Sequence, residues 1–338
     1  MRESRQGLTE RWVQESAIES SLQAGTPAVD DEHVYVGDMS GAFYAFSRDD
    51  GSVEWTAQRD GTLSDSSPWY QEGTVYVGSG GGTVYAFDTT DGSARWTYSC
   101  ASAVTSSPVS CGRHLYVGSN DGTLLALDID DGSLVWQATL DVPVNSQPGY
   151  SDDGIVYVTT KGGQVHAYDA DDGSERWSKG FGASAGTSSP VVDDTRGVVY
   201  VAASEVLALD IETGNPVWST SFYGSCGGSS PVFDESGVYA AGANGRVYAI
   251  DTPDSLLVSN PDWEFQSWDV SIVGDLALAG DRLAVASLDG GLYVLETDSG
   301  EAAVSVEVPC EVRSSPVVVG DELYVAGADG AVMALEWD

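Results

Sequence analysis

The sequence predicts an all-β fold, a single eight-bladed β-propeller of four-stranded antiparallel blades that spans residues 1–338. Three observations carry this prediction. A unit of about 41 residues repeats along the chain, its apolar residues alternate with a period of two, and glycine-rich turns separate its short apolar runs. Helical repeats are excluded because their apolar residues would recur every 3.6 positions.

Each repeat contains the pattern seen in VYVGSGGGTVYAFDTTDGSARW, which holds two strand-like runs, two turns and a tryptophan. The eight equivalent segments are 34–55, 75–96, 115–136, 156–177, 199–218, 238–263, 283–304 and 323–338. A Ser-Ser-Pro tripeptide, or a looser copy of it, precedes most segments by about eight residues and marks a further strand. Each repeat therefore predicts one four-stranded propeller blade.

The four strands of a blade can be assigned in order from the best copies. The first follows the proline, as in PVVVG at 316–320, and the second is typified by LYVAG at 323–327. The third is typified by VYAFD at 84–88 and the fourth by SARW at 93–96. Glycine-rich hairpin turns join the second and third strands, and an Asp-Gly turn joins the third and fourth.

The two chain ends are expected to complete one blade together. The last repeat stops after its third strand, whereas ERW at 10–12 matches ERW at 175–177 with no strand before it. We therefore expect a strand near 8–14 to complete blade eight at 313–338. This pairing would close the ring and cover an otherwise exposed strand edge.

The charge of the chain excludes one class of partner. It has 52 acidic and 14 basic residues, for a formal net charge of -38. Such a surface repels a phosphate backbone, so we expect no nucleic-acid binding. The charge either serves one partner, such as a basic protein or a cation, or adapts the whole surface to molar salt, where self-repulsion is screened. Acidic residues occur in every repeat, which favours salt adaptation.

The first 20 residues contain no apolar run, and no later window is apolar enough for a membrane span. We therefore expect no signal peptide and no membrane insertion. The absence of such segments favours a cytoplasmic location, and an extracytoplasmic location would follow if an export segment had been removed. We expect the protein to be a monomer. The four cysteines form no CxxC pair, and neither Cys226–Cys310 nor Cys100–Cys111 is expected to form a disulfide.

One eleven-residue motif carries a family resemblance. The pattern A-x-D-x-x-x-G-x-x-x-W recurs at 86–96, 126–136, 167–177 and 208–218, and 45–55 departs only at Ser47. It resembles the tryptophan-docking motif of the pyrroloquinoline-quinone-type propellers, which include BamB-like proteins. In this arrangement the tryptophan packs over the small alanine and over the glycine of the neighbouring blade.

The resemblance implies two classes of function. Some members are quinoprotein dehydrogenases, which hold the quinone (PQQ) and Ca²⁺ in the central funnel and oxidise alcohols or sugars. Others, such as the BamB-like proteins, lack the cofactor and act as scaffolds. This chain has no adjacent cysteine pair and few inserted loops, so we favour a non-enzymatic scaffold without cofactor or metal. A PQQ- and calcium-dependent dehydrogenase and a small-ligand sensor remain the alternatives.

The funnel is expected to be built by the segments that lead into the first strand of each blade. Carboxylates and an amide there could hold Ca²⁺, and an arginine could pair with an anion. The candidate ligand-binding residues are Asp65, Asn145, Asp269, Asp275 and Arg313. The alternative is a water-filled, hydroxyl-lined channel with scattered polar groups.

The repeat pattern is weakest at 253–270, where PDSLLVSNPDWEFQSWDV replaces a regular turn. Its aromatic residues Trp263, Phe265 and Trp268 either repack within a decayed repeat or form a partner-docking face. The three histidines fall in different repeats and do not form a ligand cluster. The acidic turns at 128–132 and 168–172 lack the glutamate of a calcium loop, so we expect ordinary β-turns.

Overall fold

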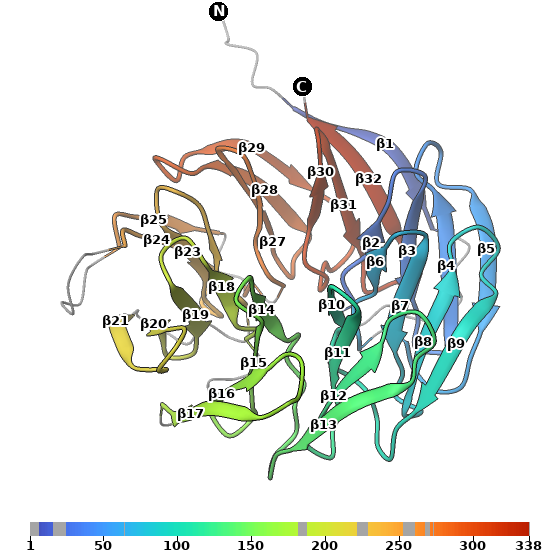
Figure 1. Cartoon of the computed structure of the whole chain (residues 1–338). Coiled ribbons are helices and arrows are strands. Elements are labelled where there is room, and N and C mark those ends of the chain that lie inside the picture. The colour runs from blue at the N-terminus through green and yellow to red at the C-terminus, as the bar shows by residue number, and fades with distance from the viewer. Residues whose placement is uncertain are drawn as a thin grey trace, which may run out of the picture.

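The computed structural model describes residues 7–15, 25–63, 65–181, 188–221, 229–252, 261–267, 271–272 and 274–337. Within these residues, thirty-two strands form eight four-stranded antiparallel sheets and no helix is present. The sheets stand as blades around a central channel (Figure 1). The predicted eight-bladed propeller is confirmed. The described residues accordingly offer no helix that could span a membrane.

The innermost strands, which face the channel, are β2 (Ala28–Val29), β6 (Trp69–Gln71), β10 (Val109–Cys111), β14 (Gly149–Ser151), β18 (Val191–Asp193), β22 (Val232–Phe233), β26 (Ala277–Ala279) and β30 (Val317–Val319). The second strands are β3 (His33–Gly37), β7 (Thr74–Gly78), β11 (His114–Gly118), β15 (Ile155–Thr159), β19 (Val198–Ala202), β23 (Val238–Ala241), β27 (Arg282–Ala286) and β31 (Glu322–Ala326). The third strands are β4 (Ala42–Ser47), β8 (Thr83–Asp88), β12 (Thr123–Asp128), β16 (Gln164–Asp169), β20 (Glu205–Asp210), β24 (Arg246–Ile250), β28 (Gly291–Glu296) and β32 (Val332–Trp337). The outermost strands are β5 (Val53–Gln58), β9 (Ala94–Ser99), β13 (Leu134–Thr139), β17 (Glu175–Gly180), β21 (Pro216–Ser221), β25 (Trp263–Gln266), β29 (Ala302–Glu307) and β1 (Leu8–Gln14).

The ring closes as the sequence predicts. β1 pairs antiparallel with β32, so blade eight has the order β1-β32-β31-β30. The two strands lie side by side in Figure 1. An ion cluster reinforces this seam, since Glu322 pairs with both Arg11 and Arg48, and Arg48 also donates to the Asp30 carbonyl. The chain ends are therefore joined to blade one as well as to each other.

The hydrophobic core lies between neighbouring blades rather than at the centre of the ring. One cluster, for example, combines Val84, Ala86 and Trp96 of blade two with Leu115 and Leu127 of blade three, all buried. Alternate residues of each strand point to opposite faces, and both faces pack on another blade. This explains why the second and third strands are apolar at almost every position.

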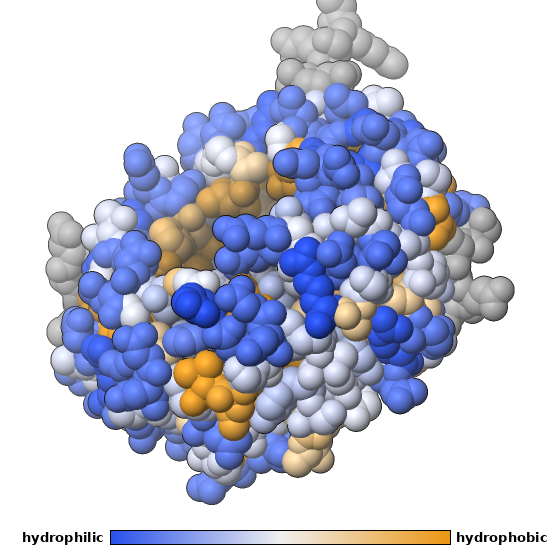
Figure 2. Space-filling model, turned by 45° about the vertical axis from the view of Figure 1, so that its right-hand side comes forward, coloured by the Kyte–Doolittle hydropathy of each residue, from blue (hydrophilic) through white to orange (hydrophobic). Residues whose placement is uncertain are grey.

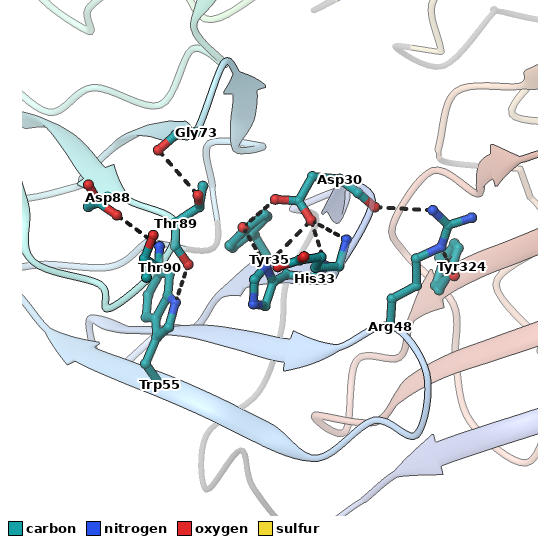
Figure 3. A network of polar contacts seen from close by, with 11 residues as sticks. Asp30, His33, Tyr35, Arg48, Trp55, Gly73, Asp88, Thr89, Thr90 and Tyr324 are labelled. Carbon is teal, nitrogen blue, oxygen red and sulfur yellow. Dashed lines mark hydrogen bonds and ion pairs between the residues drawn. The ribbon is translucent and has the colours of Figure 1, made fainter.

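The tryptophan motif fastens each blade to the next. In blade one, Trp55 donates its indole N–H to the Thr89 carbonyl of blade two at 2.8 Å, as Figure 3 shows. Its ring packs against Gly92, where an added Cβ would lie 2.4 Å from the indole. The same bond runs from Trp12, Trp96, Trp136, Trp177 and Trp263 to the carbonyls of Arg48, Ile129, Ala170, Ile211 and Thr297.

The alanine of the motif has a different place from the glycine. Ala45, Ala86, Ala126, Ala167 and Ala208 are the cross-strand partners of the tryptophans in their own blades. A β-bulge follows each of these alanines. The small side chain thus leaves room under the indole, while the glycine receives it in the next blade.

Candidate functional site

A ring of polar residues surrounds the channel at one level. Its members are the second residues of the Ser-Ser-Pro tripeptides and their equivalents: Thr26, Ser67, Ser107, Gln147, Ser189, Ser230, Asp275 and Ser315. Because six of the eight carry hydroxyls, we call this set the hydroxyl ring. It occupies the start of the innermost strands, where one residue from every blade approaches the channel.

The hydroxyl ring is tied together by hydrogen bonds between blades. A backbone N–H of one blade donates to the side-chain oxygen at the same position of the next blade. Seven such bonds run from Thr26 to Ser67, Ser67 to Ser107, Gln147 to Ser189, Ser189 to Ser230, Ser230 to Asp275, Asp275 to Ser315 and Ser315 to Thr26. Between blades three and four, the Gln147 amide donates to the Pro108 carbonyl at 3.3 Å. The ring is therefore a structural belt around the channel.

The other two residues of each Ser-Ser-Pro tripeptide are buried and also structural. Ser66 accepts the Gly78 N–H at 3.0 Å, and Ser314 accepts the Ala326 N–H at 2.9 Å. These bonds tie the start of an innermost strand to the end of the second strand in the same blade. The proline nitrogen carries no hydrogen, so it needs no hydrogen-bond acceptor there. The tripeptide thus has a packing role in these blades.

A polar funnel lies on one side of the hydroxyl ring. Its volume is about 370 Å³, and its wall adds Asp65, Thr105, Asn120, Asn145 and Arg313 to the ring. The structure thereby brings four of the five predicted funnel residues together around one cavity. The fifth, Asp269, lies outside the described residues.

A hydroxyl-lined channel was the alternative that the sequence left open, but the hydroxyls of the ring, Asn120 and Thr105 were not named individually as funnel residues. Their signal in the sequence was the Ser-Ser-Pro repeat itself, together with the asparagine of a hairpin turn. The Thr105 hydroxyl donates to Asn120 Oδ1 at 2.8 Å. Asn120 reaches the funnel because the hairpin between the second and third strands ends on the same side of the ring as the segment before the innermost strand.

The charged groups of the funnel are few and mostly engaged. Asp65 accepts the Thr62 hydroxyl at 3.1 Å, and Arg313 donates to Glu311 at 3.0 Å. Loss of solvent raises the pKa of Asp275, whose carboxylate accepts the Ser230 N–H. Asn145 contributes a buried Oδ1 for which the described residues supply no hydrogen-bond donor. These funnel residues do not select a ligand of one particular charge or shape.

A quinone with Ca²⁺ does not fit the described residues of the funnel. A flat ring needs an aromatic or apolar face, and Ca²⁺ needs six to eight oxygen ligands. No aromatic residue lines the cavity in the described part of the chain. The described residues also contain no group of three His, Cys, Asp or Glu side chains placed to hold a metal. Asp269, which the sequence offered as a funnel residue, lies outside those residues, and so does Trp268.

The other side of the hydroxyl ring is an apolar lower channel. Two hollows of about 420 and 460 Å³ lie there, lined by the ring residues themselves and by the residues that follow them in the innermost strands. The half-buried or exposed apolar side chains of these walls include Val29, Tyr70, Val191, Phe233, Leu278 and Val317. The hydroxyl ring thus divides a polar funnel from an apolar passage.

The predicted partner-docking residues are partly accounted for by packing. Trp263 occupies the tryptophan-docking position, since it bonds to Thr297 and its ring contacts Gly300 of blade seven. Phe265 is half-buried and contacts the Tyr293 ring edge-on, with centroids 5.2 Å apart. Trp268 lies outside the described residues, so docking of a partner on this set stays a prediction. Cys100, Cys111 and Cys310 are free thiols, and Cys226 lies outside the described residues.

The fold and the motif define the chain as an eight-bladed propeller of the PQQ-like type. Its sequence matches the family described as outer membrane protein assembly factor BamB over residues 4–149, 120–260 and 260–338. The chain belongs to this family. No curated protein sequence matches it.

Solved structures show the same architecture. The crystal structure of BamB from Moraxella catarrhalis superposes with a TM-score of 0.81 at 21% identity, covering 97% of this chain and 99% of that one. The computationally designed Ika8 protein gives 0.79 at 19% identity, with the same coverage of 97% and 99%. Quinohemoprotein alcohol dehydrogenase from Comamonas testosteroni gives 0.80 at 15% identity, covering 97% of this chain and 76% of the enzyme. At these identities the likeness establishes the fold alone.

Proposed function

We propose that this propeller is a non-enzymatic scaffold that binds protein partners through one face of the ring and is adapted to high salt. The observation that carries the proposal is the hydroxyl ring. Seven of its eight positions use a side-chain oxygen to bind the backbone of the preceding blade. The polar groups at the floor of the funnel therefore serve the rigidity of the ring, which suits a binding platform.

Family membership supports the same function. The family is described as an outer membrane protein assembly factor, which names a role in protein assembly rather than in a reaction. A propeller offers two rigid faces of turns and loops to partners, and loops on a rigid frame commonly carry binding residues. Phe265, in the outermost strand of blade six, and Trp268, three positions further along the chain, are candidates for such contacts. Their replacement by alanine tests whether a partner is lost.

The surface charge supports adaptation to salt. The net charge is -38, and the basic residues are 12 arginines and two lysines. The visible face is largely hydrophilic, with hydrophobic side chains gathered in a hollow and in small patches (Figure 2). At about 0.1 M ionic strength the Debye length is about 10 Å, so neighbouring carboxylates on one face repel each other. Molar salt screens this repulsion, and the proposal predicts higher thermal stability in molar KCl than in dilute buffer.

The quinoprotein dehydrogenase and the small-ligand sensor are the competing functions. The dehydrogenase is tested by thermal unfolding in molar KCl, with and without pyrroloquinoline quinone and Ca²⁺. A ligand at about 100 times its Kd adds about 2.7 kcal/mol to the stability of the folded state. An unchanged melting temperature supports the scaffold, and a clear rise overturns it in favour of quinone binding. Cross-linking in cells of the source organism then identifies the partners of the scaffold.

A further inference from the structure

The face of the molecule at the open end of the lower channel carries a dense ring of negative charge. The turns between the innermost and second strands, one from each blade, all lie at this end and together surround the channel opening. Their exposed carboxylates, which we call the acidic rim, are Asp31, Glu32, Glu72, Asp152, Asp153, Asp194, Glu235, Asp281 and Asp321. Arg113, Arg196 and Arg282 are the basic residues of the same turns.

The negative charges of the acidic rim are close enough to act on one another. At blades four and five, Asp194 accepts the backbone N–H of Asp152 at 3.1 Å. Burial raises the pKa of Asp194, and the carboxylates of Asp152, Asp153 and Asp193 raise it further. A basic group placed among these carboxylates relieves that repulsion, so the rim is complementary to lysine and arginine side chains.

Inside the acidic rim the surface becomes apolar. The lower channel holds the hollows of about 420 and 460 Å³, whose walls beyond the hydroxyl ring are mainly prolines, valines, leucines and aromatic residues. Tyr70, in this wall, is one of the few large apolar side chains that are more than a third exposed, at 37%. The eight innermost strands also end their sheets here, so each has an edge without a neighbouring strand. Free strand edges pair readily with an extended chain.

We propose that the lower channel and the acidic rim bind an extended segment of a partner protein in which basic residues flank an apolar run. The apolar run enters the channel against Val191, Leu278 and Val317, and the basic residues meet the rim. The inference rests on the proposed scaffold function and specifies where on the ring that function resides. The charge is the selective element, because an acidic flank is repelled from the same opening.

The test uses the full chain and a short fluorescent peptide with lysines before a run of valine and leucine. A second peptide has glutamates in place of the lysines. We expect the lysine peptide to bind saturably, with an affinity that falls as salt rises, and the glutamate peptide to bind at least about tenfold more weakly. Absence of saturable binding of the lysine peptide, or equal binding of both peptides, overturns the proposal.

Two matched sets of variants locate the binding site. The rim variant combines Asp152→Asn, Asp153→Asn and Asp194→Asn, which removes three charges and keeps an oxygen acceptor at each position. Its control removes three charges from the outer turns of the same face through Asp91→Asn, Asp131→Asn and Asp172→Asn. Three exposed charge contacts predict about tenfold weaker binding for the rim variant and little change for the control. Equal weakening by both sets indicates attraction by the whole surface and overturns the proposal.

The channel itself is tested with near-isosteric changes. Val191→Thr with Val317→Thr makes the channel wall polar without changing its volume, and we expect about tenfold weaker binding. Val53→Thr with Val135→Thr is the control, since these valines are exposed on outermost strands at 41% and 42%. If the rim and channel variants keep every partner that wild type cross-links in cells, the channel inference fails and the scaffold stands. If wild type cross-links none, the scaffold itself fails.

Discussion

The packing of a tryptophan of one blade on a glycine of the next predicts how a substitution at Gly173 changes the stability of the fold. This residue has φ +71° in the Asp-Gly turn of blade four, and a Cβ added there would lie 2.6 Å from the ring of Trp136. Gly154, in another turn of the same blade, has φ +75° with nothing within 4 Å of an added Cβ. The two glycines thus share a left-handed backbone and differ in whether a tryptophan covers them.

The cost of an alanine can be worked out for both positions. At Gly154 the left-handed backbone costs about 1–2 kcal/mol, and the stiffer unfolded chain returns about 0.4–1 kcal/mol, so the net loss is about 1 kcal/mol. At Gly173 the indole must also retreat by about 0.8 Å to reach ordinary contact. That movement strains the 2.8 Å bond from Trp136 to the Ala170 carbonyl and overpacks the seam, for about 2 kcal/mol more. We therefore expect Gly173→Ala to lose about 3 kcal/mol.

The assay is urea unfolding in molar KCl, followed by both tryptophan fluorescence and circular dichroism to check that the transition is two-state. A double-mutant cycle supplies the control. In a Trp136→Leu background, the smaller side chain leaves room for the new methyl group, and Gly173→Ala should then cost no more than Gly154→Ala does. Equal losses from Gly173→Ala and Gly154→Ala in the wild-type background would refute the reasoning, since only backbone strain would then matter.

Three further predictions concern the ring as a whole. Deleting residues 1–14 removes the strand that closes blade eight, so the melting temperature should fall for the entire ring rather than for one blade; an unchanged melting curve contradicts the closure. Ser189→Ala removes the acceptor of the Gln147 N–H, bonded at 3.1 Å, and should cost about 1–2 kcal/mol in urea unfolding, whereas a neutral result contradicts the belt. Asp275→Asn keeps an acceptor for the Ser230 N–H and removes a carboxyl whose pKa is raised in the folded state. Between the ordinary and the raised pKa of Asp275, the folded wild type binds more protons than its unfolded chain does. Its stability therefore falls as pH rises through that window. The variant should be the more stable at neutral pH but not below about pH 4.

The fold was predictable because the same sequence pattern occurs in eight copies along the chain. Alternation of apolar residues recurs in each blade, a hairpin glycine in seven of the eight, and an Asp-Gly turn in the first four, so the regular copies identify the irregular ones. The strand at Leu8–Gln14 was predictable for the same reason, since ERW at 10–12 matches the outermost strand of blade four. Even Trp263, after an irregular segment, bonds to blade seven as the regular tryptophans bond to their neighbours.

The candidate site was predictable only in part. Asp65, Asn145 and Arg313 precede ring positions in their blades, so their place at the funnel follows from chain order alone. The bonds of the hydroxyl ring could not be read in the same way. Ser67 and Ser107 are 40 positions apart, and their bond depends on the angle and spacing between two blades. A serine pair before a proline reads as a local turn signal, whereas its second hydroxyl acts across the blade boundary.

The hydroxyl ring explains why the channel is divided into a polar funnel and an apolar lower channel. Each innermost strand passes from the funnel through the ring and into the lower channel, so one residue per blade fixes the level at which polar lining gives way to apolar lining. Asp275 stands in this belt where other blades have serine, and its N–H still donates to Ser315. This position holds serine, threonine, aspartate or glutamine, and in seven of the eight blades its side-chain oxygen bonds to the preceding blade, so its role is to hold the blades together. We therefore expect substitutions that alter what the propeller binds to lie in the acidic turns and the channel walls, because these residues do not take part in the bonds of the hydroxyl ring.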